Sequence, residues 1–123
     1  MTTDVLRELE QIAPVVAVHG NNDDAALVKE LPARRVIDAD GAQIGMLHAP
    51  GRSQGRAERL AAAFPGCDAI VYGHTHVPEI VRHGRLFLLN PGSPTERRRA
   101  PTRAMVDLSI ESGTLSPRLV RLP

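Results

Sequence analysis

The sequence predicts a single α/β domain, and three features point to it. Its 123 residues are enough to enclose one hydrophobic core. The short apolar runs at 15–18 and 68–72 are typical of buried strands, whereas residues 4–12 and 55–64 have the spacing or composition of helices. The last third alternates apolar and polar residues around glycine turns, as hairpins do. Helices and strands therefore alternate first, and hairpins follow.

The first 30 residues predict helix, strand and short helix. Apolar side chains recur at helical spacing over residues 4–12, with charged side chains between them. The run "VVAV" at 15–18 predicts a buried strand that leads into "HGNNDD". Asp23 or Asp24 can cap a short helix that continues to Glu30, because a carboxylate accepts the free N–H groups of a first turn.

The rest of the chain predicts strands around one further helix. "RRVIDADGAQIGMLH" predicts two strands joined at Asp40-Gly41, a dipeptide that favours tight hairpin turns. The Ala- and Leu-rich segment 55–64 predicts a helix, and 68–72 a buried strand. Two later hairpins are predicted around His83-Gly84 and Ser112-Gly113.

Composition excludes several classes of protein. Apolar residues make up 42% and charged residues 24%, and the net charge of +1 gives no overall attraction to nucleic acid or to a membrane surface. Cys67 is the only cysteine, so no disulfide can form within the chain. No signal peptide or apolar stretch of about 20 residues is present. We expect a soluble protein of the cytoplasm.

Metal-binding side chains gather where predicted strands end. Asn21 follows one strand, His48 a second, and His74 and His76 a third. The carboxyl ends of parallel strands share one edge of a sheet, and residues two apart on a strand face the same side. Imidazole and amide oxygen suit divalent Mn, Fe, Ni or Zn. The alternative is that His74 and His76 are exposed loop residues. A cupin does not fit, because the helices and the spacing after His76 disagree with it.

Four motifs occur in an order that resembles the calcineurin-like metallophosphoesterases. They are "VHGNND", "GMLHAPG", "VYGHTHVP" and "LLNPGSPTERR". The resemblance covers residues 1–123 as one domain. Within this superfamily, the chain resembles the small single-domain phosphodiesterases of bacteria and archaea. It implies a four-layer α-β-β-α sandwich with two central sheets and a two-metal centre at the sheet edge.

The resemblance also implies a role for each motif residue. Asn21, His48 and His74 would bind the second metal ion, and His76 would reach the first. The metal would be divalent, with Mn²⁺ expected and Zn²⁺, Ni²⁺ or Fe²⁺ as alternatives. The implied chemistry is phosphoester hydrolysis, in which two ions orient the phosphoryl group for in-line attack by a bridging hydroxide.

Residues around these ligands would have supporting roles. Asn22 stands where many relatives carry a histidine that acts as general acid, and Asp23 would lie in the surroundings of the metal. Asn90 to Ser93 would form a structural loop beside the site.

Two motifs of this family do not occur in the sequence. It contains no Asp-x-His and no Gly-Asp, which in the family hold the first metal and bridge both ions. We expect an N-terminally incomplete domain that lacks a strand-helix-strand unit of roughly 30 residues. Two dications about 4 Å apart repel by about 16 kcal/mol at an effective dielectric constant of 20. Since the four remaining ligands are neutral, we expect them to hold one ion weakly rather than two.

Two classes of function are compatible with these observations. The first is a metal-dependent phosphodiesterase or phosphatase that takes a small phosphoester substrate. The second is an inactive protein-binding module, similar to the retromer scaffold subunit that shares this fold. A homo-oligomer is left open. The arginines at 97, 98, 99 and 103 could attract a phosphodiester or could simply be a solvated loop, and His19 fits a surface role better than a substrate contact.

Overall fold

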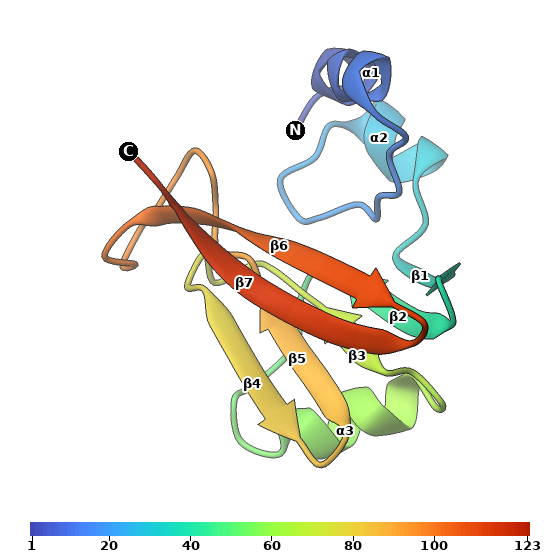
Figure 1. The fold of residues 1–123 in the computed structure, drawn as a ribbon. Helices are drawn as coiled ribbons and strands as arrows, with labels where there is room; N and C mark the ends of the chain where they lie inside the picture. Colours follow the sequence, from blue (N-terminus) through green and yellow to red (C-terminus); the bar gives the residue numbers. More distant parts are fainter.

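The computed structural model describes residues 1–123 as three helices and seven strands (Figure 1). Every helix and hairpin expected from the sequence is present. No helix is long and apolar enough to cross a lipid bilayer. The elements are α1 (Thr3–Ile12), α2 (Ala25–Glu30), β1 (Arg34–Ala39), β2 (Ala42–Leu47), α3 (Arg56–Ala63), β3 (Ala69–Val71), β4 (Glu79–His83), β5 (Leu86–Asn90), β6 (Arg103–Glu111) and β7 (Thr114–Leu122).

Five strands form the main sheet in the order β1-β2-β3-β5-β4. The central strands β2, β3 and β5 run parallel, and the outer strands β1 and β4 pair antiparallel to their neighbours. The carboxyl ends of β2 and β3 therefore lie side by side at one edge of the sheet, as the motif positions predict. The loops that follow these two strands carry the histidines at 48, 74 and 76.

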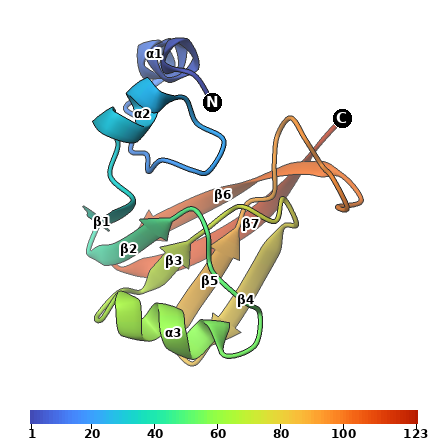
Figure 2. The same ribbon diagram turned by 180° about the vertical axis from the view of Figure 1, so that it is seen from behind.

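Helix α3 covers one face of the sheet and the β6–β7 hairpin covers the other (Figure 2). Each interface encloses a cluster of buried apolar side chains, and burial of each leucine, isoleucine or phenylalanine among them contributes about 1.5–3 kcal/mol. Gly45 of β2 is required there, because a Cβ atom at this position would lie 2.6 Å from the Phe64 ring. The buried residues are Leu60, Phe64, Ile70, Tyr72 and Leu88 under α3, and Ala42, Ile44, Ala69 and Leu89 under the hairpin.

Two hairpin turns dock onto each other and fix the β6–β7 hairpin to the sheet. Asp40 and Ser112 both have left-handed backbone angles, with φ of 47°, and each is followed by a glycine in the same region. The Asp40 carboxylate accepts a hydrogen bond from Ser112 N–H at 2.9 Å, and its carbonyl accepts one from Gly113 N–H at 2.8 Å. The residues that form these two turns therefore also position the β6–β7 hairpin on the sheet.

The predicted strand at 15–18 is absent, and this part of the prediction is wrong. The segment belongs to no helix or strand, and no neighbouring strand pairs with it. Its main chain has one hydrogen bond, from the Arg35 guanidinium to Ala17 O, and directly after it His19 N–H donates to Pro32 O. Val16 remains 42% exposed. An apolar run becomes a strand only where a partner offers a row of backbone groups.

Helices α1 and α2 form a lobe on the opposite side of the molecule from α3 (Figures 1 and 2). An ion pair between Arg7 and Glu30, 2.6 Å apart, joins the two helices. Asp24 caps α2 by accepting a hydrogen bond from Leu27 N–H at 2.9 Å, as expected from the sequence. Residues 1–33 are hereafter the helical lobe, and residues 34–122 the sheet body.

Candidate metal centre

His48 lies directly after β2 and faces the loop between α1 and α2. Its Nε2 atom is 2.6 Å from Asn21 Oδ1. Gly20 permits this approach, because a Cβ atom at that position would lie 2.9 Å from the imidazole of His48. On its other side the carbonyl of His48 accepts a hydrogen bond from Gly73 N–H at 2.9 Å, which joins the loops that follow β2 and β3.

His74 completes a group of three donor atoms. Its Nδ1 atom is 3.3 Å from Asn21 Oδ1 and 3.4 Å from His48 Nε2. A divalent ion with bonds of about 2.1 Å separates its ligands by about 3.0 Å at right angles and about 3.4 Å in a tetrahedron. The separations of 3.3 and 3.4 Å from His74 Nδ1 therefore fit donors that share one ion. The 2.6 Å between His48 Nε2 and Asn21 Oδ1 is a hydrogen-bond distance, and these two atoms would move apart by a few tenths of an ångström to bind the same ion. We call Asn21, His48 and His74 the donor triad.

His76 is not part of the donor triad. Its Nδ1 atom lies 2.6 Å from the carbonyl oxygen of Glu96, a residue of the loop between β5 and β6. It nevertheless lines one cavity of about 380 Å³ together with Asn21 and His48. The two histidines of the Gly-His-Thr-His motif therefore point to different partners.

The backbone explains this divergence and corrects the predicted geometry. Strand β3 ends at Val71, so both histidines lie in a loop and do not share the face of a strand. His74 and His76 have φ angles of 73° and 62°, in the left-handed region that non-glycine residues rarely adopt. Each such residue costs about 1–3 kcal/mol and persists only where surrounding contacts impose it.

Asn90 supplies those contacts. It is completely buried, and its amide nitrogen donates to Thr75 Oγ1 at 2.9 Å and to Gly73 O at 3.3 Å. Its amide oxygen accepts from Gly92 N–H at 3.0 Å. Thr75, between the two histidines, also accepts from Val77 N–H. The Asn-Pro-Gly-Ser motif thus holds the histidine loop in place, as expected from the sequence. The contribution of Thr75 to this hydrogen-bond network was not anticipated from the sequence.

The charge state of His48 suits a metal ligand. Partial burial lowers its pKa, the neighbouring His74 lowers it further, and the carboxylate of Asp23 opposes the shift only in part. The imidazole is therefore neutral at pH 7, which is the charge state in which a ring nitrogen can bind a metal ion once its proton moves to the other nitrogen. The triad contains two imidazoles and one amide, and nowhere does the structure group three His, Cys, Asp or Glu side chains as a metal site.

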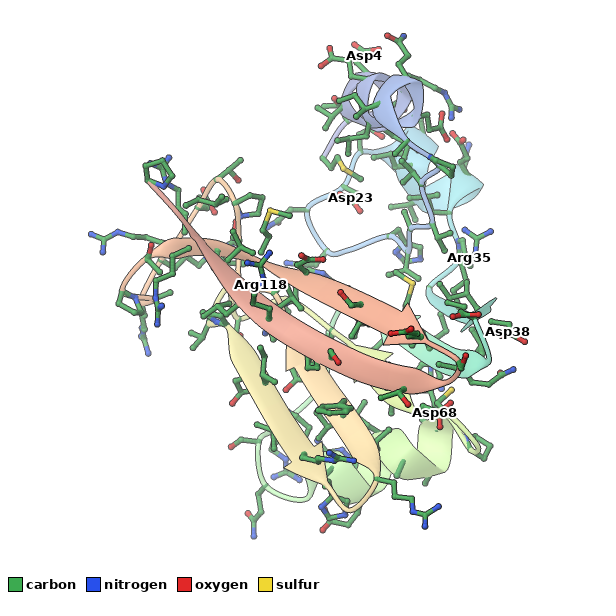
Figure 3. All side chains as sticks on the ribbon, viewed as in Figure 1. Asp4, Asp23, Arg35, Asp38, Asp68 and Arg118 are labelled. Atoms are coloured by element: carbon green, nitrogen blue, oxygen red, sulfur yellow. The ribbon has the colours of Figure 1, made fainter.

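Asp23 is occupied by contacts within its own loop. Its carboxylate accepts a hydrogen bond from Gly20 N–H at 2.6 Å and lies 3.0 Å from the Met1 ammonium (Figure 3). Burial raises the pKa of Asp23, but the Gly20 hydrogen bond and the Met1 charge outweigh burial, so the net pKa is lowered. The carboxylate fixes the loop that carries Asn21. Asn22 is exposed at the rim of the same cavity.

A second cavity is also lined by Asn21 and His48. It has a volume of about 350 Å³, and His19 and Arg34 are its polar walls. No motif in the sequence indicated Arg34, and His19 was expected to be a surface residue. The remaining lining residues are Gly20, Asn21, Ala33, Leu47, His48 and Ala49.

Two archaeal proteins are similar to this chain in sequence. A probable metallophosphoesterase of Methanothermobacter thermautotrophicus is 35% identical over 120 residues, which are 96% of this chain and 69% of the relative. Another of Methanocaldococcus jannaschii is 35% identical over 111 residues, which are 88% of this chain. The chain spans only 55% of that second relative's length.

Solved structures share the fold. The solution structure of a Thermotoga maritima protein is 30% identical, with a TM-score of 0.73 over 98% of this chain and 74% of that one. Vps29 of Entamoeba histolytica complexed with zinc gives 0.75 at 22% identity, covering 98% and 76% of the two chains. A novel archaeal phosphodiesterase gives 0.72 at 21% identity, covering 96% and 76%. These similarities agree with the predicted metallophosphoesterase fold.

The family assignment rests on sequence. The model of the calcineurin-like phosphoesterase superfamily domain matches residues 1–113, which is most of the chain. The four motifs lie within that match, and the fold agrees with it. This chain belongs to the calcineurin-like phosphoesterase superfamily.

Proposed function

We propose that this chain is a calcineurin-like phosphoesterase domain that binds a divalent metal ion and takes part in phosphodiester hydrolysis. The observation that carries the proposal is the donor triad, whose three donor atoms lie 2.6–3.4 Å from one another. Membership of the superfamily supports hydrolysis of phosphoesters, and the archaeal phosphodiesterase of the same fold supports a diester.

Each residue of the proposed site has a separate task. Asn21 Oδ1, His48 Nε2 and His74 Nδ1 would hold the ion, and His76, which lines the same cavity as Asn21 and His48, would be a ligand for a second ion if one binds. The ion would supply Lewis-acid stabilisation of the charge that develops on phosphoryl oxygens. Asn90 keeps the histidine loop in its left-handed conformation, so the donors need little rearrangement when metal and substrate bind.

Manganese is the proposed ion, with zinc, nickel and iron as alternatives. Two imidazoles and an amide oxygen form a mixed nitrogen and oxygen donor set, which all four ions accept. The zinc complex of Vps29 shows that a protein of this fold binds such an ion. The absence of a thiolate from the triad disfavours ions that require soft ligands.

Metal titration tests the triad directly. Calorimetric titration of the apoprotein with Mn²⁺ should give one binding event, and His74→Ala should weaken it by about 100-fold or more, because it removes a direct ligand. His83→Ala is the matched control, since His83 is exposed at the end of β4, and it should bind like wild type. Equal affinities of the His74 and His83 variants would overturn the proposed site.

Hydrolysis of bis(p-nitrophenyl) phosphate tests the reaction. Turnover should depend on added Mn²⁺, disappear with a chelator and fall in parallel with metal affinity in His74→Ala. Metal-independent turnover, or turnover unchanged in that variant, would contradict metal-dependent hydrolysis.

A protein-binding scaffold is the second candidate, and one observation favours it. Val5, Leu9 and Ile12 lie along one face of α1 and are 43%, 44% and 82% exposed. An exposed apolar helix face can mark a contact with another protein. A wild-type chain that binds no Mn²⁺ and hydrolyses no diester would favour this role over the enzyme.

A further inference from the structure

The loop between β5 and β6 carries arginines whose surroundings differ. Arg97 donates to the carbonyl oxygens of Ala100 and Pro101, and Arg103 donates to that of Pro123. Both side chains therefore satisfy backbone groups of the loop and of the last strand. Arg99 has no hydrogen bond or ion pair in the structure, so nothing links it to the donor triad.

Arg98 lies directly beside the histidine loop. Its Nη1 atom donates to the carbonyl oxygen of His74 at 3.3 Å. Its Nε atom lies 3.7 Å from the carboxylate of Glu96, the residue whose carbonyl oxygen contacts His76. The guanidinium thus contacts the main chain of one motif histidine and lies beside Glu96, the residue that contacts the other.

The Arg98 backbone and exposure suit a ligand contact. Its φ angle of 48° is left-handed, which is rare for a long side chain and marks a position held by its surroundings. The side chain is 44% exposed. A guanidinium has five N–H donors, and only two point toward the partners described above. The others have no hydrogen-bond partner within the protein.

The positive charge of Arg98 suits an anionic ligand. The donor triad is neutral, whereas a phosphodiester carries a negative charge on its non-bridging oxygens. Guanidinium groups bind such oxygens in pairs, through short charge-assisted hydrogen bonds. Glu96 offers a competing carboxylate at 3.7 Å, too long for a tight bond and open to exchange for a phosphoryl group.

We propose that Arg98 is a substrate-binding residue that holds a non-bridging phosphoryl oxygen beside the donor triad, exchanging its Glu96 contact for the substrate. This inference rests on the proposed phosphodiesterase function and deepens it. It assigns recognition of the anionic phosphoryl group to a residue outside the predicted metal ligands.

Inorganic phosphate is the probe, titrated calorimetrically onto the Mn²⁺-loaded protein. Arg98→Ala should raise the dissociation constant for phosphate by about tenfold or more, the loss expected for a charge-assisted hydrogen bond. Arg98→Lys keeps the charge but not the paired donors, so its constant should lie between wild type and alanine. Arg99→Ala is the matched control and should stay within about twofold of wild type.

Two further readouts separate binding from folding. With bis(p-nitrophenyl) phosphate, Arg98→Ala should raise KM by about tenfold while Mn²⁺ affinity stays unchanged. Glu96→Gln should have the opposite sign and bind phosphate severalfold more tightly, because the competing carboxylate is gone. This variant and the lysine variant test the inference even if Arg98→Ala folds poorly.

The outcomes distinguish this inference from the proposed function. Mn²⁺-dependent turnover in wild type, with equal phosphate affinity in the Arg98 and Arg99 variants, would overturn the role of Arg98 alone. A wild-type protein that neither binds Mn²⁺ nor hydrolyses the diester would overturn both. Weaker phosphate binding in Arg98→Ala only, with metal binding intact, supports the role of Arg98.

Discussion

The helical lobe and the sheet body are held together in different ways. The sheet body has paired strands and buried clusters on both faces of its main sheet. The helical lobe buries Leu6 and Leu27 almost completely, but its Ile12 side chain is 82% exposed. Residues 15–18 of the lobe pair with no strand. The donor triad takes two histidines from the sheet body and Asn21 from the lobe.

The two regions therefore hold their metal-binding residues with different rigidity. Elements with few buried apolar contacts open locally at a lower free energy than a well-packed core. The sheet body therefore presents His48 and His74 on a rigid edge, and the position of Asn21 depends on a weaker element. A metal ion bound by all three would stabilise the lobe more than the sheet.

Core truncation gives the largest expected contrast between the regions. Ile70→Ala, in the centre of the sheet, should lower the free energy of unfolding of the whole protein by about 2–5 kcal/mol. Leu27→Ala, in α2, should mainly increase amide exchange in the lobe. Urea unfolding and hydrogen exchange measure the two effects. Equal loss of protection in both regions for both variants would show that they unfold as one unit.

Alkaline pH should weaken the sheet body through Tyr72. Burial and then the 2.7 Å hydrogen bond to Glu79 raise the pKa of Tyr72 from 10.0 to about 12. A raised pKa contributes stability that is complete below pH 10 and is lost as pH rises through about 12. The loss amounts to about 2–3 kcal/mol at most.

Tyr72→Phe is the control for this pH dependence. Denaturant unfolding between pH 9 and 12 should show a decline in wild type that is smaller in the variant. Parallel curves for both proteins would contradict the assignment to Tyr72.

Asn90→Ala should affect the histidine loop more than the core. The substitution leaves Thr75 Oγ1 and Gly73 O without their donor and should cost about 1–3 kcal/mol of stability. Because the loop then loses its left-handed conformation, Mn²⁺ affinity should fall by about 10- to 100-fold. Metal titration beside urea unfolding measures both. Unchanged metal affinity would show that Asn90 does not position His74.

The smallest expected effect concerns the cap of α2. Asp24→Ala removes the hydrogen bond to Leu27 N–H and should cost about 1 kcal/mol, confined to the lobe. Exchange of α2 amides should speed up while amides of the main sheet keep their rates. Faster exchange throughout the sheet would contradict the separation of the two regions.

Local signals in the sequence predicted most elements. Both long helices follow from apolar spacing or composition, and the Asp40-Gly41 turn follows from residues that tolerate positive φ. The strand at 15–18 was wrong because an apolar run does not reveal whether a partner strand lies beside it. Pairing is a property of the assembled sheet.

The candidate site was predictable in its members but not in its geometry. The order of the motifs predicted that Asn21, His48 and His74 bind one ion. The parallel pairing of β2 and β3 explains why the two histidines lie close together. The direction of His76 depends on left-handed backbone angles imposed by Asn90, a residue distant in sequence. The position of Arg98 depends likewise on a loop with no periodic pattern.

Metal-dependent amide exchange tests the central claim most directly, namely that one ion joins the lobe and the sheet body. Hydrogen exchange would be measured for α2 and for β3, with and without saturating Mn²⁺, in wild type, Asn21→Ala, His74→Ala and His83→Ala. A metal ion at a concentration of about 100 times its dissociation constant stabilises the folded state that binds it by about 2.7 kcal/mol. We expect Mn²⁺ to slow exchange of α2 in wild type and His83→Ala and to have no effect in the other two variants. Metal binding that leaves exchange of α2 unchanged in wild type, or that protects α2 equally in Asn21→Ala, would contradict the claim.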